Sequence, residues 1–150
     1  MKKKFLIGFS IIYVLFLIFI FFIKGRGGVL SGASFKEYVS MMCNFIPFKT
    51  IGDYIIALKE QRMNLIIPLG NLGGNFIIFM PFAYIMHSFT KIKERYFLLI
   101  TFIIILIIEI IQLFTRSGSF DIDDLILNML GAGFAYLICM KMQAKKNNTL

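Results

Sequence analysis

Polar and charged side chains recur at helical spacing inside the apolar runs of this chain. Glu109 lies among the isoleucines of residues 103–111, where a carboxyl group is unexpected. Three sets of residues recur in this way: Asn71 and Asn75; Glu109, Gln112 and Arg116; Asp121, Asp124 and Asn128. Residues spaced by three, four or seven positions share one face of a helix. We therefore expect each set to project from a single helix face.

The chemistry of these side chains gives them candidate roles. Glu109, Asp121 and Asp124 are the candidate catalytic residues, with Glu109 as general acid or base and the two aspartates as ligands of a divalent cation. The candidate ligand-binding residues are Asn75, Gln112, Arg116 and Asn128. An oxygen-rich metal site uses more ligands than two aspartates supply. Whether a metal is bound therefore remains open at this stage.

Purely structural interpretations compete with each of these roles. Asp121 and Asp124 have the spacing of a capping box at a helix start, while Asp123 points off their shared face. Asn75 and Asn128 can join helices by hydrogen bonds, and Arg116 can anchor a helix end at the interface. Capping does not explain Glu109. Its structural alternatives are a hydrogen bond to a neighbouring amide, an ion pair with Arg116, or a carboxyl group that stays protonated.

Membrane-spanning helices are the elements that must position these residues. The chain is 59% hydrophobic, against roughly 45–50% for a soluble domain. A helical span needs about 20 apolar residues, so a few spans use up all 150 residues as one domain. The expected spans cover residues 5–23, 65–86, 96–114 and 124–140. We predict an all-α fold, a polytopic bundle of four transmembrane helices.

Three details refine this prediction. The first apolar run exceeds the roughly 7–15 residues of a signal-peptide core, so we interpret it as a retained span, with cleavage as the alternative. Pro68 and Pro81 predict a kinked second span. In the loop at residues 24–63, the apolar patches at 38–42 and 54–58 are too short to span and are interpreted as interfacial amphipathic helices.

Charge predicts the orientation. The net charge is +8, and the short basic segments at residues 2–4, 91–95 and 141–146 fall on one side of a four-span bundle. Cytoplasmic loops are enriched in Lys and Arg, so we expect both termini in the cytoplasm and the loop at 24–63 outside. The polar sets then lie in the outer halves of their spans and form an outward-facing cleft. We expect the lipid bilayer as a partner and no nucleic acid, because no basic stripe stands free of the apolar runs.

Four segments match, in order, the motifs of a known family. They are residues 44–48 (N-x-x-P-F), 74–82 (G-N-x-x-x-F-x-P-F), 109–116 (E-x-x-Q-x-x-x-R) and 121–131 (D-x-x-D-x-x-x-N-x-x-G). With this spacing, the region from about 44 to 140 resembles the VanZ-like family, named for a protein associated with resistance to the glycopeptide antibiotic teicoplanin. The resemblance implies a bacterial multi-span protein of the cell envelope.

Three functions fit these observations. The first is a VanZ-like envelope protein that contributes to teicoplanin resistance by binding or modifying a lipid-linked cell-wall precursor or a lipoglycopeptide at the polar cleft. The second is a membrane enzyme acting on a lipid or lipid-phosphate headgroup, with Glu109 and Asp124 as acid/base or metal-binding groups. The third, a proton-coupled transporter, is weaker because no polar groups continue into the cytoplasmic halves. No nucleophile motif supports an enzyme over a binding protein.

Overall fold

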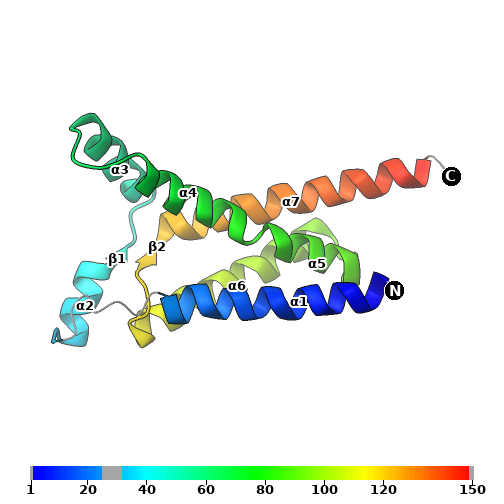
Figure 1. Cartoon of the computed structure of the whole chain (residues 1–150), viewed down its shortest axis with the longest axis horizontal. Coiled ribbons are helices and arrows are strands. Elements are labelled where there is room, and N and C mark those ends of the chain that lie inside the picture. The colour runs from blue at the N-terminus through cyan, green and yellow to red at the C-terminus, as the bar shows by residue number, and fades with distance from the viewer. Residues whose placement is uncertain (1, 25–31, 149–150) are drawn as a thin grey trace.

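The computed structural model describes residues 2–24 and 32–148, and most of its regular structure is helical (Figure 1). A parallel pair of two-residue strands is the exception within this part of the chain. The elements are α1 (Lys2–Ile18), its π-helical end η1 (Phe19–Lys24), α2 (Phe35–Met42), β1 (Cys43–Asn44), α3 (Lys49–Lys59), α4 (Ile66–Ile78), α5 (Met80–Thr90), α6 (Glu94–Thr115), β2 (Phe120–Asp121) and α7 (Ile122–Asn148).

Within the described residues, four helical segments are long and apolar enough to cross a bilayer. They are Lys3–Ile23, Ile66–Thr90, Glu94–Thr115 and Ile122–Asn148. Each contains or overlaps one of the four expected runs, so the predicted all-α, multi-span fold is confirmed. The last helix continues beyond residue 140, because the Lys, Gln and Ala residues there favour a helix and neither Pro nor Gly interrupts them. The chain is a multi-pass membrane protein.

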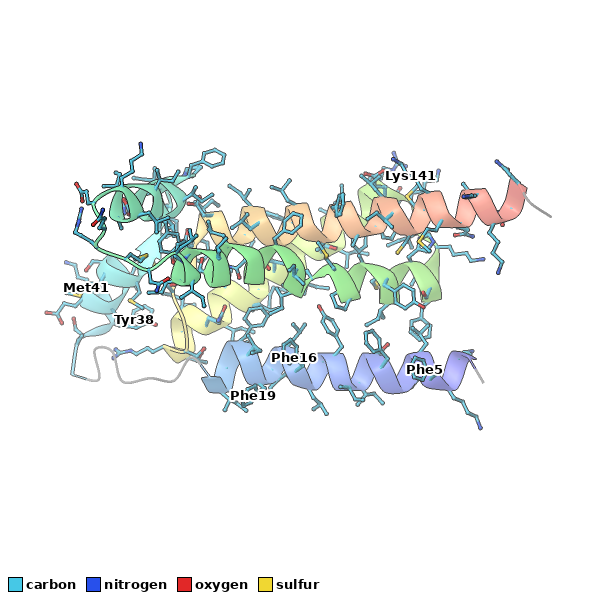
Figure 2. All side chains as sticks on the ribbon, turned by 45° about the horizontal axis from the view of Figure 1, so that its top comes forward. Phe5, Phe16, Phe19, Tyr38, Met41 and Lys141 are labelled. Atoms are coloured by element: carbon cyan, nitrogen blue, oxygen red, sulfur yellow. The ribbon has the colours of Figure 1, made fainter. Side chains whose placement is uncertain are left out.

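The two termini lie at the same end of the bundle, which is here called the terminal end (Figure 1). The opposite end carries α2, α3 and the β1–β2 pair, and is called the loop end. In Figure 2, Tyr38 and Met41 lie at the loop end, and Lys141 lies on the half of α7 nearer the C-terminus. Four spans return the chain to its starting side, as this arrangement requires.

The second span is broken in the middle of the bundle. α4 ends at Ile78 and α5 begins at Met80, with Phe79 between them at φ −94° and ψ 0°. Pro81 follows as the second residue of α5, and a proline in a continuous helix would remove one backbone hydrogen bond and clash with the preceding turn. The break near residue 79 agrees with the predicted kink.

Helix α7 is the centre of the bundle, and it packs against α4, α5 and α6. Its Tyr136 is completely buried, and the ring stacks on Phe97 of α6 with centroids 4.0 Å apart. The Tyr136 hydroxyl donates to the carbonyl of Ile92, which satisfies its polar end. The ring of His87 packs edge-on against Tyr136 at 5.3 Å. Aromatic packing therefore holds the helices together on this side of the bundle.

Gly131 sets the distance between α4 and α7. A Cβ atom at this position would lie 1.6 Å from the carbonyl oxygen of Phe76, so no other residue fits without moving one backbone. Small residues permit such close approach of membrane helices. This contact brings the polar face of α4 directly against that of α7.

The first span is attached more loosely than the others. Most of its apolar side chains are exposed, and Tyr13 and Phe21 are the buried members among its described residues. The Tyr13 hydroxyl donates to the carbonyl of Ile78, 2.8 Å away at the break in the second span. Gln112 of α6 donates to the carbonyl of Phe21 in η1 at 3.2 Å. Two side-chain hydrogen bonds thus link this span to the bundle.

Two short helices form in the segment between the first and second spans. α2 carries its own capping box, in which Ser34 and Glu37 bond to each other's backbone amides. α3 has no side-chain cap from its own first turn, and Phe48 precedes it in a left-handed conformation at φ 65°. Helices at residues 35–42 and 49–59 agree with the prediction from the two apolar patches.

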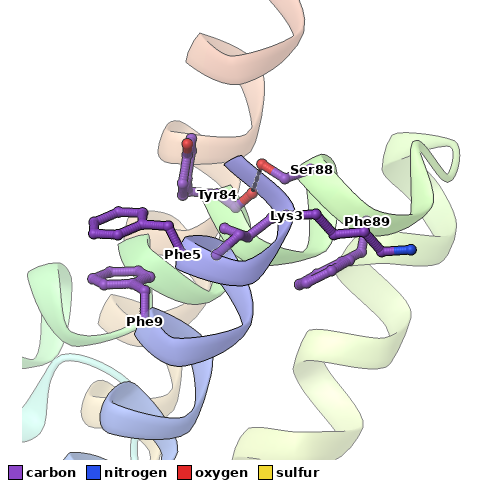
Figure 3. A pocket seen from close by; sticks show the side chains of 7 residues that line it. Lys3, Phe5, Phe9, Tyr84, Ser88 and Phe89 are labelled. Carbon is purple, nitrogen blue, oxygen red and sulfur yellow. Dashed lines mark hydrogen bonds between the residues drawn. The ribbon is translucent and has the colours of Figure 1, made fainter. Parts of the chain in front are cut away.

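A pocket of about 900 Å³ opens between α1 and α5 near the terminal end (Figure 3). Phe5, Phe9, Tyr84 and Phe89 give it an apolar lining, and Lys3 lies at its edge. Ser88 also lines it, but its hydroxyl donates to the carbonyl of Tyr84. The pocket is therefore apolar with a single cation among the residues that line it.

Candidate functional site

The start of α7 carries three aspartates with different partners. Asp121 belongs to β2, which pairs with β1 so that it lies opposite Asn44. Its carboxylate accepts hydrogen bonds from the Asn44 amide at 3.1 Å, the Thr50 hydroxyl, and the backbone amide of Asp123 at 2.9 Å. Both oxygens of Asp121 are therefore occupied. Their contacts join the loop before α3 to the first turn of α7.

Asp123 caps helix α3, although the two are far apart in the sequence. Its carboxylate oxygens accept the backbone amides of Phe48 and Ile51, at the start of α3. The first amides of any helix lack partners within the helix, and a carboxylate there satisfies them and complements the helix dipole. The side chain is completely buried. Asp123 thus has a capping role, and the helix it caps is α3 rather than α7, which carries it.

Asp124 faces α4, where the Asn75 amide donates to one of its oxygens. This bond lies on the face that the close contact at Gly131 brings together. The spacing of Asp121 and Asp124 resembled a capping box, but Asp124 is bonded to the neighbouring helix instead. The sequence-predicted residues Asn75 and Asp124 are brought together by the fold.

Glu109 is buried at the same level of the bundle. Only 4% of it is exposed. Asp124 and Asp121 are close enough to interact with it electrostatically. Its second oxygen, Oε2, is buried and has no hydrogen-bond partner among the residues that the structure describes. An unpartnered buried carboxyl oxygen costs free energy, which makes it the least satisfied group of the site.

Asn128 lies one helical turn beyond Asp124 on α7 and is 1% exposed. Its Oδ1 atom is likewise buried without a hydrogen-bond partner within residues 2–24 and 32–148. Asn75, Glu109, Asp124 and Asn128 are named the polar cluster from here on. They come from three spans and belong to the faces that the sequence spacing predicted.

Two predicted residues of the α6 face have other partners. Gln112 donates to the Phe21 carbonyl, as described above. Helix α6 ends at Thr115, and Arg116 has left-handed backbone angles, so the helical spacing from Glu109 does not continue to it. The Arg116 guanidinium donates to the carbonyl of Ala33 at 3.0 Å and lies 5.5 Å from the ring centre of Tyr38. Its contacts thus hold the start of α2 against the end of α6.

Several residues of the site escaped the sequence analysis. Asn44 and Thr50 both bond to Asp121, and Asn44 also accepts the amide of Ile46 to shape the turn before α3. Asn44 is part of the family motif N-x-x-P-F, so the sequence marked this residue, but the motif alone did not indicate what the side chain binds. Burial raises the pKa of Tyr54 on α3, and the nearby carboxylates of Asp124 and Asp121 raise it further. Tyr54 therefore lies beside the acidic groups.

Tyr38 fixes the loop between the third and fourth spans. It is 2% exposed, and its hydroxyl donates to the carbonyl of Gly118. Burial raises its pKa, and the Arg116 guanidinium opposes that shift. Nothing in the spacing of the sequence indicated this contact, because the two residues are 80 positions apart.

Asp121 and Asp124 were also candidate ligands of a divalent cation. Among the described residues, no group of three or more His, Cys, Asp or Glu side chains is placed to hold a metal ion. Asp121 and Asp123 already accept hydrogen bonds on both oxygens. The carboxyl groups of Glu109 and Asp124 thus remain as the groups for acid–base chemistry or ligand binding.

Fold and site together define a class: multi-span helical membrane proteins with a buried polar cluster near one end of the bundle. A family model described as VanZ/LLP1 matches residues 9–143, nearly the whole chain. The chain belongs to the VanZ/LLP1 family. The match begins within the first span, whereas the motifs that suggested the resemblance begin at Asn44.

No curated protein and no solved structure matches the chain significantly.

Proposed function

We propose that this protein binds a lipid-linked or cell-wall ligand at the polar cluster, on the outer side of the cell membrane. The observation that carries the proposal is Glu109, a carboxyl group 4% exposed inside an apolar helix, whose Oε2 has no partner in the described structure. A polar group of this kind in a membrane span is expensive and is a default candidate for function. A bound ligand would supply the missing hydrogen bond.

The contacts support a division of roles. Glu109 and Asp124 are the proposed acid–base or ligand-binding groups, Asn75 orients Asp124, and Asn128 offers a second open acceptor. Asp121 acts as a positioning residue, because its carboxylate is occupied by Asn44, Thr50 and the amide of Asp123. We assign Gln112 and Arg116 positioning roles for the same reason: Gln112 bonds to η1, and Arg116 bonds to Ala33 before α2.

The experiment compares Glu109→Gln and Asp124→Asn with the unmodified protein in a bacterial host. The readouts are susceptibility to teicoplanin and turnover of labelled envelope lipids. The matched control is Asp53→Asn, which removes an exposed carboxylate at the same end of the bundle. We expect both site variants to change susceptibility and the control to leave it unchanged. If both site variants fold and neither readout changes, the polar cluster is not a functional site.

The same experiment addresses a second candidate function, an enzyme acting on a lipid headgroup. The observation that favours it is the proximity of two carboxyl groups, Glu109 and Asp124, because such a pair can serve as general acid and base. An enzyme predicts that lipid turnover disappears in both variants. Binding without catalysis predicts altered susceptibility with no change in turnover.

We propose that the loop end lies outside the cell and both termini lie in the cytoplasm. The two cysteines test this directly, since Cys43 lies in β1 at the loop end and Cys139 lies in the C-terminal half of α7. A thiol reagent that cannot cross membranes should label Cys43 in intact cells and Cys139 only after permeabilisation. Burial raises the pKa of the Cys43 thiol, so mildly alkaline buffer is needed. The reverse pattern, checked with Cys43→Ser and Cys139→Ser, would place the polar cluster on the inner side.

A further inference from the structure

A groove runs along the seam between the first span and α4. Its volume is about 680 Å³, within the roughly 300–1,000 Å³ of small-molecule sites. Its wall is mostly apolar and comes from the first span, α4 and the start of α5: Phe9, Ile12, Phe16, Ile20, Ile77 and Pro81. Phe9 also lines the pocket near the terminal end, so the hollow continues along α1. Its mostly apolar lining suits a hydrocarbon chain.

One end of the groove is polar and leads to the polar cluster. Asn71 and Asn75 line it there, and Asn75 is the residue that bonds to Asp124. The Oδ1 atom of Asn71 is buried and has no partner among the described residues. Asn128 and Glu109, deeper in the bundle, carry the other two unpartnered oxygens of this region. A molecule in the groove would therefore lie against Asn71, a lining residue with an open acceptor, and beside the polar cluster.

The charged residues near the groove indicate which kind of head group such a molecule would carry. Among the described residues that line this groove there is no Lys, Arg or His, whereas Lys3 lines the pocket at the other end. Arg116 is bonded to Ala33 and lies over Tyr38. Among these described lining residues a bare phosphate would find no positive partner, since anionic groups are bound by cations or by clustered N–H donors. A neutral group that donates hydrogen bonds, such as a hydroxyl, fits the unpartnered acceptors.

We propose that this groove binds a membrane lipid with a hydroxyl-bearing head group, its hydrocarbon chain between α1 and α4 and its head at Asn71 and Asn75. This inference rests on the proposed function and names the ligand class of the same site: a glycolipid-like molecule that enters sideways from the bilayer. The weak attachment of the first span, by Tyr13 and Gln112, leaves the seam accessible to lipid.

The experiment uses two photoactivatable lipids with identical chains in reconstituted vesicles, one with a single-sugar head and one with a bare phosphate head. We expect the sugar lipid to label groove residues of α1 and α4 preferentially. Losing one hydrogen bond to a buried acceptor corresponds to about a tenfold change in affinity, so Asn71→Leu should reduce sugar-lipid labelling by about that factor. Equal labelling by both lipids would overturn the proposed head group.

A second variant tests the chain site. The position of a Cβ on Gly74 has no atom within 4 Å, so Gly74→Trp should fold and fill the groove that this residue lines. It should abolish labelling, while Ile107→Trp on the exposed face of α6 should not. Labelling spread evenly over the spans and insensitive to Gly74→Trp would overturn the groove.

The two proposals fail in different ways. Groove labelling that persists in the unmodified protein, while Glu109→Gln and Asp124→Asn leave antibiotic susceptibility and lipid turnover unchanged, would refute the proposed function and keep the lipid site. Absence of groove labelling in the unmodified protein would refute the lipid site whatever the carboxyl variants do.

Discussion

The two ends of this bundle are held together by different physical interactions. On the terminal side of the break in the second span, Phe97 and Tyr136 stack inside an apolar core. At the loop end, the carboxylates of Asp121 and Asp123 accept hydrogen bonds from the first turn of α3 and from Phe48 before it. Packing of rings depends on shape and volume, whereas these bonds depend on the position of single atoms.

The two ends of the bundle therefore contribute differently. Close packing on the terminal side stabilises the association of the helices, whereas the bonds at the loop end fix the positions of the polar groups. Membrane spans have little hydrophobic drive toward one another, so close packing supplies most of their association. The loop end adds directional bonds that fix the polar groups near Glu109. A few of its acceptors remain open, including Glu109 Oε2 and Asn128 Oδ1. An arrangement built from satisfied bonds with a few open acceptors is suited to hold a ligand.

The largest effect is expected at the aromatic core. Phe97→Ala removes a completely buried ring and its stacking with Tyr136, which should lower the free energy of unfolding by about 3–5 kcal/mol. The measurement is reversible unfolding in mixed detergent micelles. Leu99→Ala, at a 56% exposed position of the same helix, serves as the control and should change little. Equal losses in both variants would mean that the ring contact does not hold the bundle.

A smaller but local effect is expected at Asp123. In Asp123→Ala the amides of Phe48 and Ile51 lose their partner, and removing a helix cap costs about 1–2 kcal/mol. Hydrogen exchange should speed up in α3 and leave the core around Phe97 protected. The control is Asp53→Ala, an exposed carboxylate within α3. Unchanged exchange at residues 48–51 would contradict the cap.

Tyr136→Phe sharpens the comparison because it keeps the ring and removes the hydroxyl. The lost bond to the Ile92 carbonyl should cost about 1 kcal/mol of unfolding free energy, well below the loss in Phe97→Ala. Tyr96→Phe, at a 48% exposed position, is the matched control. A loss as large as that of Phe97→Ala would show that hydrogen bonding also dominates the terminal side.

The smallest effect is a pH dependence of α2. The Ser34 hydroxyl and backbone amide hold the pKa of Glu37 below its ordinary value of 4.5. The capping box is therefore fully present above pH 4.5 and is lost as the pH falls through the lowered pKa. Hydrogen exchange of α2 should rise in that acid range, and Glu37→Gln should remove the dependence. A rise that persists in Glu37→Gln would come from another group.

Local patterns predicted the spans, the kink and the polar faces, because these depend on hydropathy and on three- or four-residue spacing. Asn75 and Asp124 meet as those faces implied. The partners of Asp123 and Tyr38 could not be predicted, since each contact joins residues more than seventy positions apart. The seven-residue spacing predicted Arg116 on the same helix face as Glu109, but helix α6 ends at Thr115, one residue before Arg116.

The cap of α3 also determines the order in which parts of the protein can assemble during synthesis. Asp123 accepts the amide of Phe48 across 75 positions, so when α3 leaves the ribosome the atoms that will cap it have not been synthesised. Asp124 arrives with the same late segment. A chain that stops after its third span would thus contain Glu109 without its acidic neighbours and α3 without its cap. Completion of the last helix is the step that assembles the polar cluster, and an interrupted product would lack it.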